Sequence, residues 1–253
     1  MNLFRYRLHH DFGLAPNPFW GVMTLAVCKE GIRRSRNLKI GDWVIGCGSC
    51  QLHNLGSLIY VMKVQEILTF DEYWNDSRFE IKKPRLNGSL MVMYGDNFYH
   101  TDKITNVVIQ EDSAHSNPFF ASRHLRSDTK GRNVLVSHDF FYFGDNFVKP
   151  PENFLPIATP APRGFSYKGL SKNLEKNFID WLTSSFEPGI YGEPISWKEY
   201  FPHHQYDTNY GLSESIGPGC VHLGVENIHK VGAIGVPGYG WEAKIIDTDG
   251  NEV

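Results

Sequence analysis

The sequence predicts an α+β fold, with a mixed, mainly antiparallel sheet or a small barrel, a few packing helices and a short β-rich C-terminal appendage. Three observations lead to this prediction. Short apolar stretches typical of strands dominate the first half of the chain, one long amphipathic helix follows late, and strands do not alternate regularly with helices. With 253 residues, 41% of them hydrophobic, the chain can bury a full core.

The strands are predicted from short apolar segments. Residues 3–8 alternate with period two, which is typical of a half-buried strand. Similar reasoning predicts further strands at 24–28, 43–46, 58–64, 134–136 and 140–143. A loop rich in Gly, Ser and Cys separates 43–46 from 58–64, so we expect these two strands to pair like a hairpin.

Two helices have recognisable starts. Thr69 is followed three residues later by Glu72, which predicts a capping box. This helix should direct its aromatic side chains inward, namely Phe70, Tyr73 and Trp74. Ser171 is the expected N-cap of a second helix, in which apolar residues recur at helical spacing. Between the two, the proline-rich segment 149–162 is predicted to be an extended surface connector.

Charge and hydropathy limit the partners. The net charge of -3 provides no global positive field, so a small nucleotide is a better partner than a long duplex. Contact with nucleic acid would depend on a local basic patch, and the densest one comprises Lys29, Arg33, Arg34, Arg36 and Lys39. Trp20 or Trp43 can offer a stacking face beside it, although solvated surface is the alternative interpretation. No apolar run reaches membrane length and the N-terminus lacks a signal-peptide pattern, so we expect no membrane partner and a cytoplasmic location.

The cysteines are too few for a disulfide scaffold. Cys47 and Cys50, with His53 close behind, have the spacing of a zinc knuckle or a redox motif, and Cys28 could be a fourth ligand. The alternative is two incidental loop thiols, which we favour because a structural zinc site needs four ligands. The sequence therefore predicts no metal site.

Seven stretches occur in the order found in nucleotide modification associated domain 2 proteins, and the chain resembles this family over about residues 1–200. The stretches are 11–19, 24–29, 32–34, 41–46, 69–74, 95–100 and 134–137. The resemblance implies a role in generating or handling modified nucleotides or nucleic-acid bases, often in bacteria and their phages. It names neither a reaction nor a cofactor. Cys47 and Cys50 depart from the pattern, since simple Gly or Ser loop residues are expected there.

Candidate site residues combine acid, base and phosphate-binding groups. Asp96, His100 and His115 are the catalytic candidates, because carboxylates and imidazoles serve in acid–base chemistry or hold divalent metals. The candidates for substrate binding are Asp11, Asn17, Arg33, Trp43, Asn97, Tyr99 and Asp128. The alternative interpretation is that 95–97 forms a simple turn and His100 is a hydrogen-bonded core residue.

Two functions fit these residues. The first is an enzyme or accessory factor of nucleotide or base modification, which would depend on Asp96 and His100. The second is a non-catalytic reader of a modified base, because 41–46 followed by 58–64 has the look of small barrels of the PUA and EVE type. A reader would depend on Trp20 and Trp43 instead.

The last part of the chain resembles a fragment of an adenylate-forming, AMP-binding acyl-CoA ligase, through residues 209–215, 231–238 and 242–253. This resemblance implies that Tyr210 lies beside adenine, Ser213 touches phosphate and Glu214 helps to hold Mg²⁺. The phosphate loop and later functional residues of that family are missing, so we expect a vestigial site without activity. The predicted domains are therefore 1–202, the modification domain, and 203–253, a ligase-like fragment or fusion tail.

Overall fold

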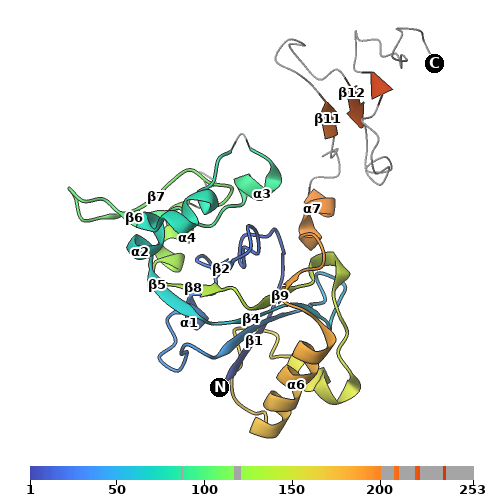
Figure 1. Cartoon of the computed structure of the whole chain (residues 1–253). Helices are drawn as coiled ribbons and strands as arrows, with labels where there is room; N and C mark the ends of the chain where they lie inside the picture. Colours follow the sequence, from blue (N-terminus) through green and yellow to red (C-terminus); the bar gives the residue numbers. More distant parts are fainter. Residues whose placement is uncertain (87, 117–120, 201–207, 211–219, 223–235, 238–253) are drawn as a thin grey trace, which may run out of the picture. The chain divides into compact units, whose positions relative to one another are not determined.

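The computed structural model describes residues 1–86, 88–116, 121–200, 208–210, 220–222 and 236–237 (Figure 1). Contacts divide the chain into two compact units, Met1–Tyr200 and Phe201–Val253. In the second unit, three short strands pair in an antiparallel manner, with β12 in the middle. They are β11 (Thr208–Tyr210), β12 (Cys220–His222) and β13 (Val236–Pro237). The other helices and strands all belong to the first unit.

A five-stranded sheet with the order β1-β3-β4-β9-β10 forms the centre of this unit. Its strands are β1 (Leu3–Arg7), β3 (Trp43–Cys47), β4 (Leu58–Lys63), β9 (Phe140–Tyr142) and β10 (Gly189–Ile190). The inner pairs β3–β4 and β4–β9 are antiparallel, whereas β1 and β10 join the edges in parallel. The predicted α+β class and the pairing of β3 with β4 are confirmed, and the sheets of the described residues are open, with no closed barrel among them.

Two smaller sheets complete the β-structure. One has the order β2-β8-β5 and is antiparallel throughout. Its strands are β2 (Met23–Leu25), β8 (Asn133–Ser137) and β5 (Glu66–Thr69). The other is the antiparallel pair of β6 (Tyr99–Thr101) and β7 (Val108–Gln110).

One long pair of strands joins the two larger sheets. β4 leads into β5 and β8 leads into β9, with only a short interruption in each. Met62 pairs with Phe140 before the interruption and Glu66 pairs with Val136 after it, so the register is the same on both sides. Gln65 bridges the interruption, because its Oε1 accepts a hydrogen bond from the Asp139 amide at 3.1 Å. These four strands form a two-stranded ribbon that keeps one register across the interruption, and we call it the β4–β9 ribbon.

Apolar side chains cover both faces of the central sheet. Phe4 and Tyr6 belong to a cluster shared with the smaller three-stranded sheet. Leu3 and Trp43 belong to a second cluster, which α6 (Lys172–Ser185) covers with Phe178 and other residues (Figure 1). The prediction that the first strand is half-buried is therefore wrong, because both of its faces are covered.

The predicted helix starts are confirmed. In α2 (Phe70–Asn75), the Thr69 hydroxyl accepts from the Glu72 amide at 3.2 Å, and the Glu72 carboxylate accepts from the Thr69 amide at 2.7 Å. Ser171 caps α6 by accepting a hydrogen bond from the Leu174 amide at 3.2 Å. Of the aromatic residues on α2, Phe70 and Tyr73 are buried, while Trp74 is only partly covered.

The proline-rich connector differs from its prediction. It contains a short 3₁₀ helix, η3 (Glu152–Phe154), and the helix α5 (Leu155–Ala158), whose residues Ile157 and Ala158 are fully buried. Pro156 lies in the first turn of α5, where a missing amide donor costs nothing. The composition suggested an extended surface chain, but three apolar residues make this segment part of the core.

The remaining helical elements are short. They are α1 (Glu30–Arg33), η1 (Ser77–Lys82), α3 (Leu90–Met93), α4 (Ala121–Asp128), η2 (Gly144–Asn146) and α7 (Ile195–Tyr200). In the described part of the chain, no helix has both the length and the apolar character needed to cross a bilayer.

Candidate functional site

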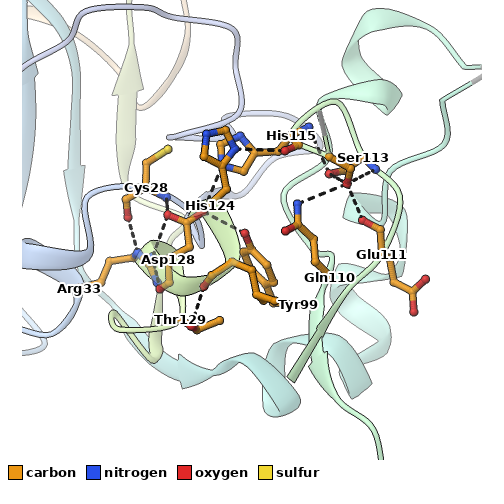
Figure 2. A network of polar contacts seen from close by, with 12 residues as sticks. Cys28, Arg33, Tyr99, Gln110, Glu111, Ser113, His115, His124, Asp128 and Thr129 are labelled. Atoms are coloured by element: carbon orange, nitrogen blue, oxygen red, sulfur yellow. Dashed lines mark hydrogen bonds and ion pairs between the residues drawn. The ribbon is translucent and has the colours of Figure 1, made fainter. Parts of the chain in front are cut away.

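A polar network surrounds the carboxylate of Asp128, the last residue of α4 (Figure 2). Its Oδ1 accepts from the Cys28 backbone amide at 2.8 Å, and its Oδ2 accepts from the Tyr99 hydroxyl at 3.1 Å. Nε2 of His115 lies 3.2 Å from Oδ2, and Nη2 of Arg33 lies 3.9 Å from Oδ1. We call these five residues the Asp128 cluster. It brings together four of the residues predicted from the sequence, which are Arg33, Tyr99, His115 and Asp128.

Arg33 positions the backbone of this cluster. Its side chain is fully buried, and its guanidinium donates to the backbone carbonyl oxygens of Cys28 at 2.7 Å, Asp128 at 2.8 Å and Asn133 at 2.9 Å. The Asn133 side chain in turn donates to the Arg33 carbonyl at 2.8 Å. The structure therefore directs this guanidinium toward protein oxygens, where it holds three separate segments together.

The backbone at Cys28 has an uncommon conformation. Cys28 and Lys29 have φ values of 52° and 42°, in the left-handed region that non-glycine residues rarely occupy. Such strain is often found at functional sites, where the surrounding structure maintains it. Here Asp128 holds the Cys28 amide and Arg33 holds its carbonyl. Burial, together with the nearby Asp128 carboxylate, raises the pKa of the Cys28 thiol to about 12.

His115 stacks on a second histidine. The rings of His115 and His124 lie 4.1 Å apart at an angle of 20°, and Nδ1 of His124 is 3.2 Å from the His115 carbonyl oxygen (Figure 2). The His115 amide donates to the Ser113 hydroxyl at 3.2 Å, which defines the turn that carries it. Contacts with Ser113 and with His124 thus hold the loop that carries His115.

Three members of the Asp128 cluster could hold a metal ion. Cys28, His115 and Asp128 each offer one ligand atom, and these atoms all lie within 4.8 Å of one another. Two other cysteines are placed differently: Cys47 is buried in the core with its Sγ 3.5 Å from the Ile157 carbonyl oxygen, and Cys50 is exposed. Among the described residues, no potential ligand group includes either of these two thiols.

Next to Cys28 in sequence, Lys29 lines a cavity of about 450 Å³. Arg7 and Arg163 contribute two further positive charges to this cavity, and Glu30 contributes one negative charge, so positive charge is in excess. The rings of Tyr6 and Phe165 also line it, and the Lys29 ammonium lies 4.4 Å from the centre of the Tyr6 ring. The cavity therefore combines positive charge with aromatic surface.

Comparison with known proteins places the chain in a family. The family model described as nucleotide modification associated domain 2 matches residues 1–201. The chain belongs to this family. Searches of curated proteins and of solved structures found no match. The family description points to nucleotide modification and specifies no reaction.

Three other predicted residues of this nucleotide modification associated domain lie in a second, fully buried polar group. The Asp96 carboxylate accepts from the hydroxyls of Thr24 at 2.8 Å and Tyr73 at 2.7 Å. Nζ of Lys82 donates to Oδ1 of Asn17 at 2.5 Å and to the Asn17 carbonyl oxygen at 3.2 Å. The third, Asn97, follows Asp96 and donates to two backbone carbonyl oxygens, each at 3.1 Å. Burial raises the pKa of Asp96 and lowers the pKa of Lys82 to about 8.

Because Lys82 is buried, we predict that the free energy of unfolding depends on pH. Because its folded pKa of about 8 lies below the ordinary value of 10.5, the unfolded chain binds more protons between these pH values. The cost of burying the charge is fully present below pH 8 and is lost as the pH rises to 10.5. We expect the free energy of unfolding of the wild type, relative to Lys82→Met, to rise by about 3 kcal/mol across this window in denaturant titrations. Lys83→Met is the control, since Lys83 is partly exposed and paired with Glu80. A difference independent of pH would contradict the burial of a charged Lys82.

Asp11 connects the N-terminal loop to the start of α7 through hydrogen bonds. Its two carboxylate oxygens lie 2.9 and 2.8 Å from the Tyr142 hydroxyl, and the Ile195 amide donates to Oδ2 at 3.3 Å. The Asp11 amide donates to the Ser196 hydroxyl at 3.0 Å. Burial raises the pKa of Asp11 to about 6. Asp11 is thus placed to position this loop within the domain.

The structure separates His100 and Trp43 from the Asp128 cluster. His100 lies in β6, where its ring stacks on Trp74 at 4.2 Å and its Nε2 is 2.7 Å from the Glu111 carboxylate. It lines a separate surface cavity of about 330 Å³. Trp43 is only 3% exposed, because it packs in the core cluster under α6. In the second unit, Tyr210 ends β11, while Ser213 and Glu214 lie outside the described residues.

Sequence reasoning missed several participants in this domain. Cys28 was considered only as a partner of Cys47 and Cys50, and its left-handed backbone leaves no mark in a single sequence. Arg7 and Arg163 line the cavity from distant segments, so no local pattern linked them. The one available signal was Lys29, which belongs to the predicted basic patch.

Proposed function

We propose that this domain is an enzyme acting on a nucleotide or a modified base, and that the Asp128 cluster is its reaction centre. One observation carries the proposal: a thiol, a phenol and an imidazole from separate segments converge on one buried carboxylate. The strained backbone at Cys28 supports it, since this conformation is costly and is maintained by two other members of the cluster.

Each group of the cluster has a chemical role to offer. The imidazole of His115 can accept or donate a proton during a reaction, which is the commonest role of histidine in acid–base catalysis. Burial and the neighbouring Asp128 raise the pKa of Tyr99, so its hydroxyl stays protonated and acts as a hydrogen-bond donor. Asp128 orients both groups, because one of its oxygens lies within 3.2 Å of each.

The positively charged cavity supports a substrate that carries phosphate. Arg7, Lys29 and Arg163 can bind phosphate oxygens, and the rings of Tyr6 and Phe165 can contact a base or sugar. Its volume of about 450 Å³ fits a small-molecule ligand. Lys29 directly follows Cys28, so the cavity and the Asp128 cluster share one short segment. The small, positively charged cavity and the net charge of -3 together favour a mononucleotide over a long duplex as the ligand.

The proposal predicts nucleotide binding in this cavity. We expect mononucleotides to raise the thermal transition temperature of the protein, and Arg163→Gln to weaken their binding at least about tenfold, since a charge-assisted hydrogen bond is worth about 1.5–3 kcal/mol. Arg36→Gln is the matched control, because Arg36 is exposed and does not line the cavity. A folded protein that shows no shift with a broad nucleotide panel would overturn the proposed function.

A reader of a modified base is the second candidate. Trp20 favours it, because this residue is partly exposed, has a left-handed backbone with φ of 61° and packs its ring edge-on against Phe19. In the same binding assay, a reader would lose affinity with Trp20→Ala and keep it with His115→Ala. For the enzyme, we expect His115→Ala to abolish conversion of the bound nucleotide, followed by mass spectrometry.

A further inference from the structure

We infer that Cys28, His115 and Asp128 bind one divalent transition-metal ion of the zinc type. Binding of the ion does not depend on the proposed function. A catalytic role of the ion does rest on it, since the ion would lie in the proposed reaction centre. The inference differs from the expectation based on sequence, which contained no metal site. The ligand atoms come from the segment after β2, the loop after β7 and the end of α4, and all lie within 4.8 Å of one another.

The distances suit a tetrahedral ion. Zinc binds thiolate sulfur at about 2.3 Å and imidazole nitrogen or carboxylate oxygen at about 2.0–2.2 Å, which puts neighbouring ligand atoms about 3.3–3.8 Å apart. Nε2 of His115 and Oδ2 of Asp128 are already 3.2 Å apart. Small rotations of the three side chains would complete the geometry, and a fourth position would remain for water or substrate, as in catalytic zinc sites.

The surroundings of the ligands resemble an outer shell. The Cys28 amide holds Oδ1 of Asp128 and the Tyr99 hydroxyl holds Oδ2, so the carboxylate is oriented before an ion arrives. Arg33 fixes the backbone carbonyls of both Cys28 and Asp128. Such outer contacts are typical of metal sites, where they orient the ligands and tune the ion.

The composition of the site selects the type of ion. A thiolate with an imidazole and a single carboxylate favours zinc, cobalt or a similar ion over Mg²⁺ and Ca²⁺, which prefer several oxygen ligands. Binding would release the thiol proton of Cys28 to solvent, because the thiolate is the ligand. The alternative is a hydrogen-bonded His115–Asp128 pair without an ion. That alternative gives the Cys28 thiol no role, and among the described residues this thiol makes no hydrogen bond.

Cobalt provides a direct test with the full chain and without any nucleotide. Metal-free protein titrated with Co²⁺ is expected to show a thiolate-to-cobalt charge-transfer absorption that saturates at one ion per chain, and Zn²⁺ is expected to displace it. Cys28→Ser should abolish this absorption, and His115→Ala should weaken cobalt binding at least tenfold. Cys50→Ser is the matched control, since Cys50 is exposed and lies outside the ligand group. Circular dichroism of the metal-free variants confirms that each one is folded.

Several results would overturn the inference. These are a wild type without saturable cobalt absorption, a Cys28→Ser protein that retains it, or a Cys50→Ser protein that loses it. The metal experiment and the nucleotide experiment fail independently. Metal binding without a nucleotide-induced thermal shift would remove the proposed function and leave the metal site. A nucleotide shift without metal binding would leave the Asp128 cluster to act through His115 and Tyr99 alone.

Discussion

Replacing Arg33 with methionine is expected to lower the free energy of unfolding by about 3–5 kcal/mol, as measured by urea denaturation. The side chain is fully buried, and its removal leaves three backbone carbonyl oxygens without their donor and takes away the guanidinium that lies 3.9 Å from the Asp128 carboxylate. Unpaired buried polar groups of this kind carry the full cost of their lost hydration.

The next residue provides the control for this experiment. Arg34 carries the same charge but is exposed, so Arg34→Met should change stability by no more than about 0.5 kcal/mol. If Arg33→Met and Arg34→Met had similar effects, the guanidinium of Arg33 would not hold the cluster as described.

Gly144→Ala is expected to destabilise the protein by about 2–5 kcal/mol in the same assay. Gly144 has a φ of 55°, and a Cβ atom there would overlap the backbone carbonyl oxygen of Glu193. The left-handed conformation costs an alanine about 1–2 kcal/mol, and relief of the overlap adds about 1–3 kcal/mol. Because Glu193 lies close before Ile195, whose amide binds Asp11, a shift of this segment should also disturb the N-terminal loop.

A variant at Gly164 distinguishes the cost of the left-handed conformation from the cost of the Cβ overlap. The φ of 71° at Gly164 is also left-handed, but nothing lies within 4 Å of a Cβ atom placed there. Gly164→Ala should therefore show the cost of the conformation alone, about 1–2 kcal/mol. Equal losses for both variants would mean that the Gly144 segment moves away from Glu193 without cost.

The fold followed from the sequence where local rules decide the structure. The capping box at Thr69 and the N-cap at Ser171 form as predicted, because both depend on residues within one helical turn. The segment 149–162 was misjudged, because its burial depends on packing against α6 and the central sheet, which are distant in sequence. Composition alone could not distinguish a buried helical turn from an extended connector.

The site was predictable only in its residue types. The acids and bases of the Asp128 cluster were identified as candidates, and so were Asp96 and His100, which the fold places elsewhere. No single sequence could separate these two groups, because each side chain finds its partners across long stretches of chain. The buried Lys82 likewise gave no signal, since it ends η1 and its partner Asn17 belongs to a loop 65 residues earlier in the chain.

The β4–β9 ribbon has a consequence for the order of folding. Tyr99, His115 and Asp128 all lie in the long excursion between its two arms, whereas Cys28 follows β2, which pairs with β8. The entropy of closing that excursion must be lost before β5 and β8 can pair, and such non-local pairing is slow. The Asp128 cluster can form only when this closure brings α4 back beside Cys28. Assembly of the Asp128 cluster is thereby coupled to completion of the sheet, so a partly folded chain would have the separate residues but not the cluster.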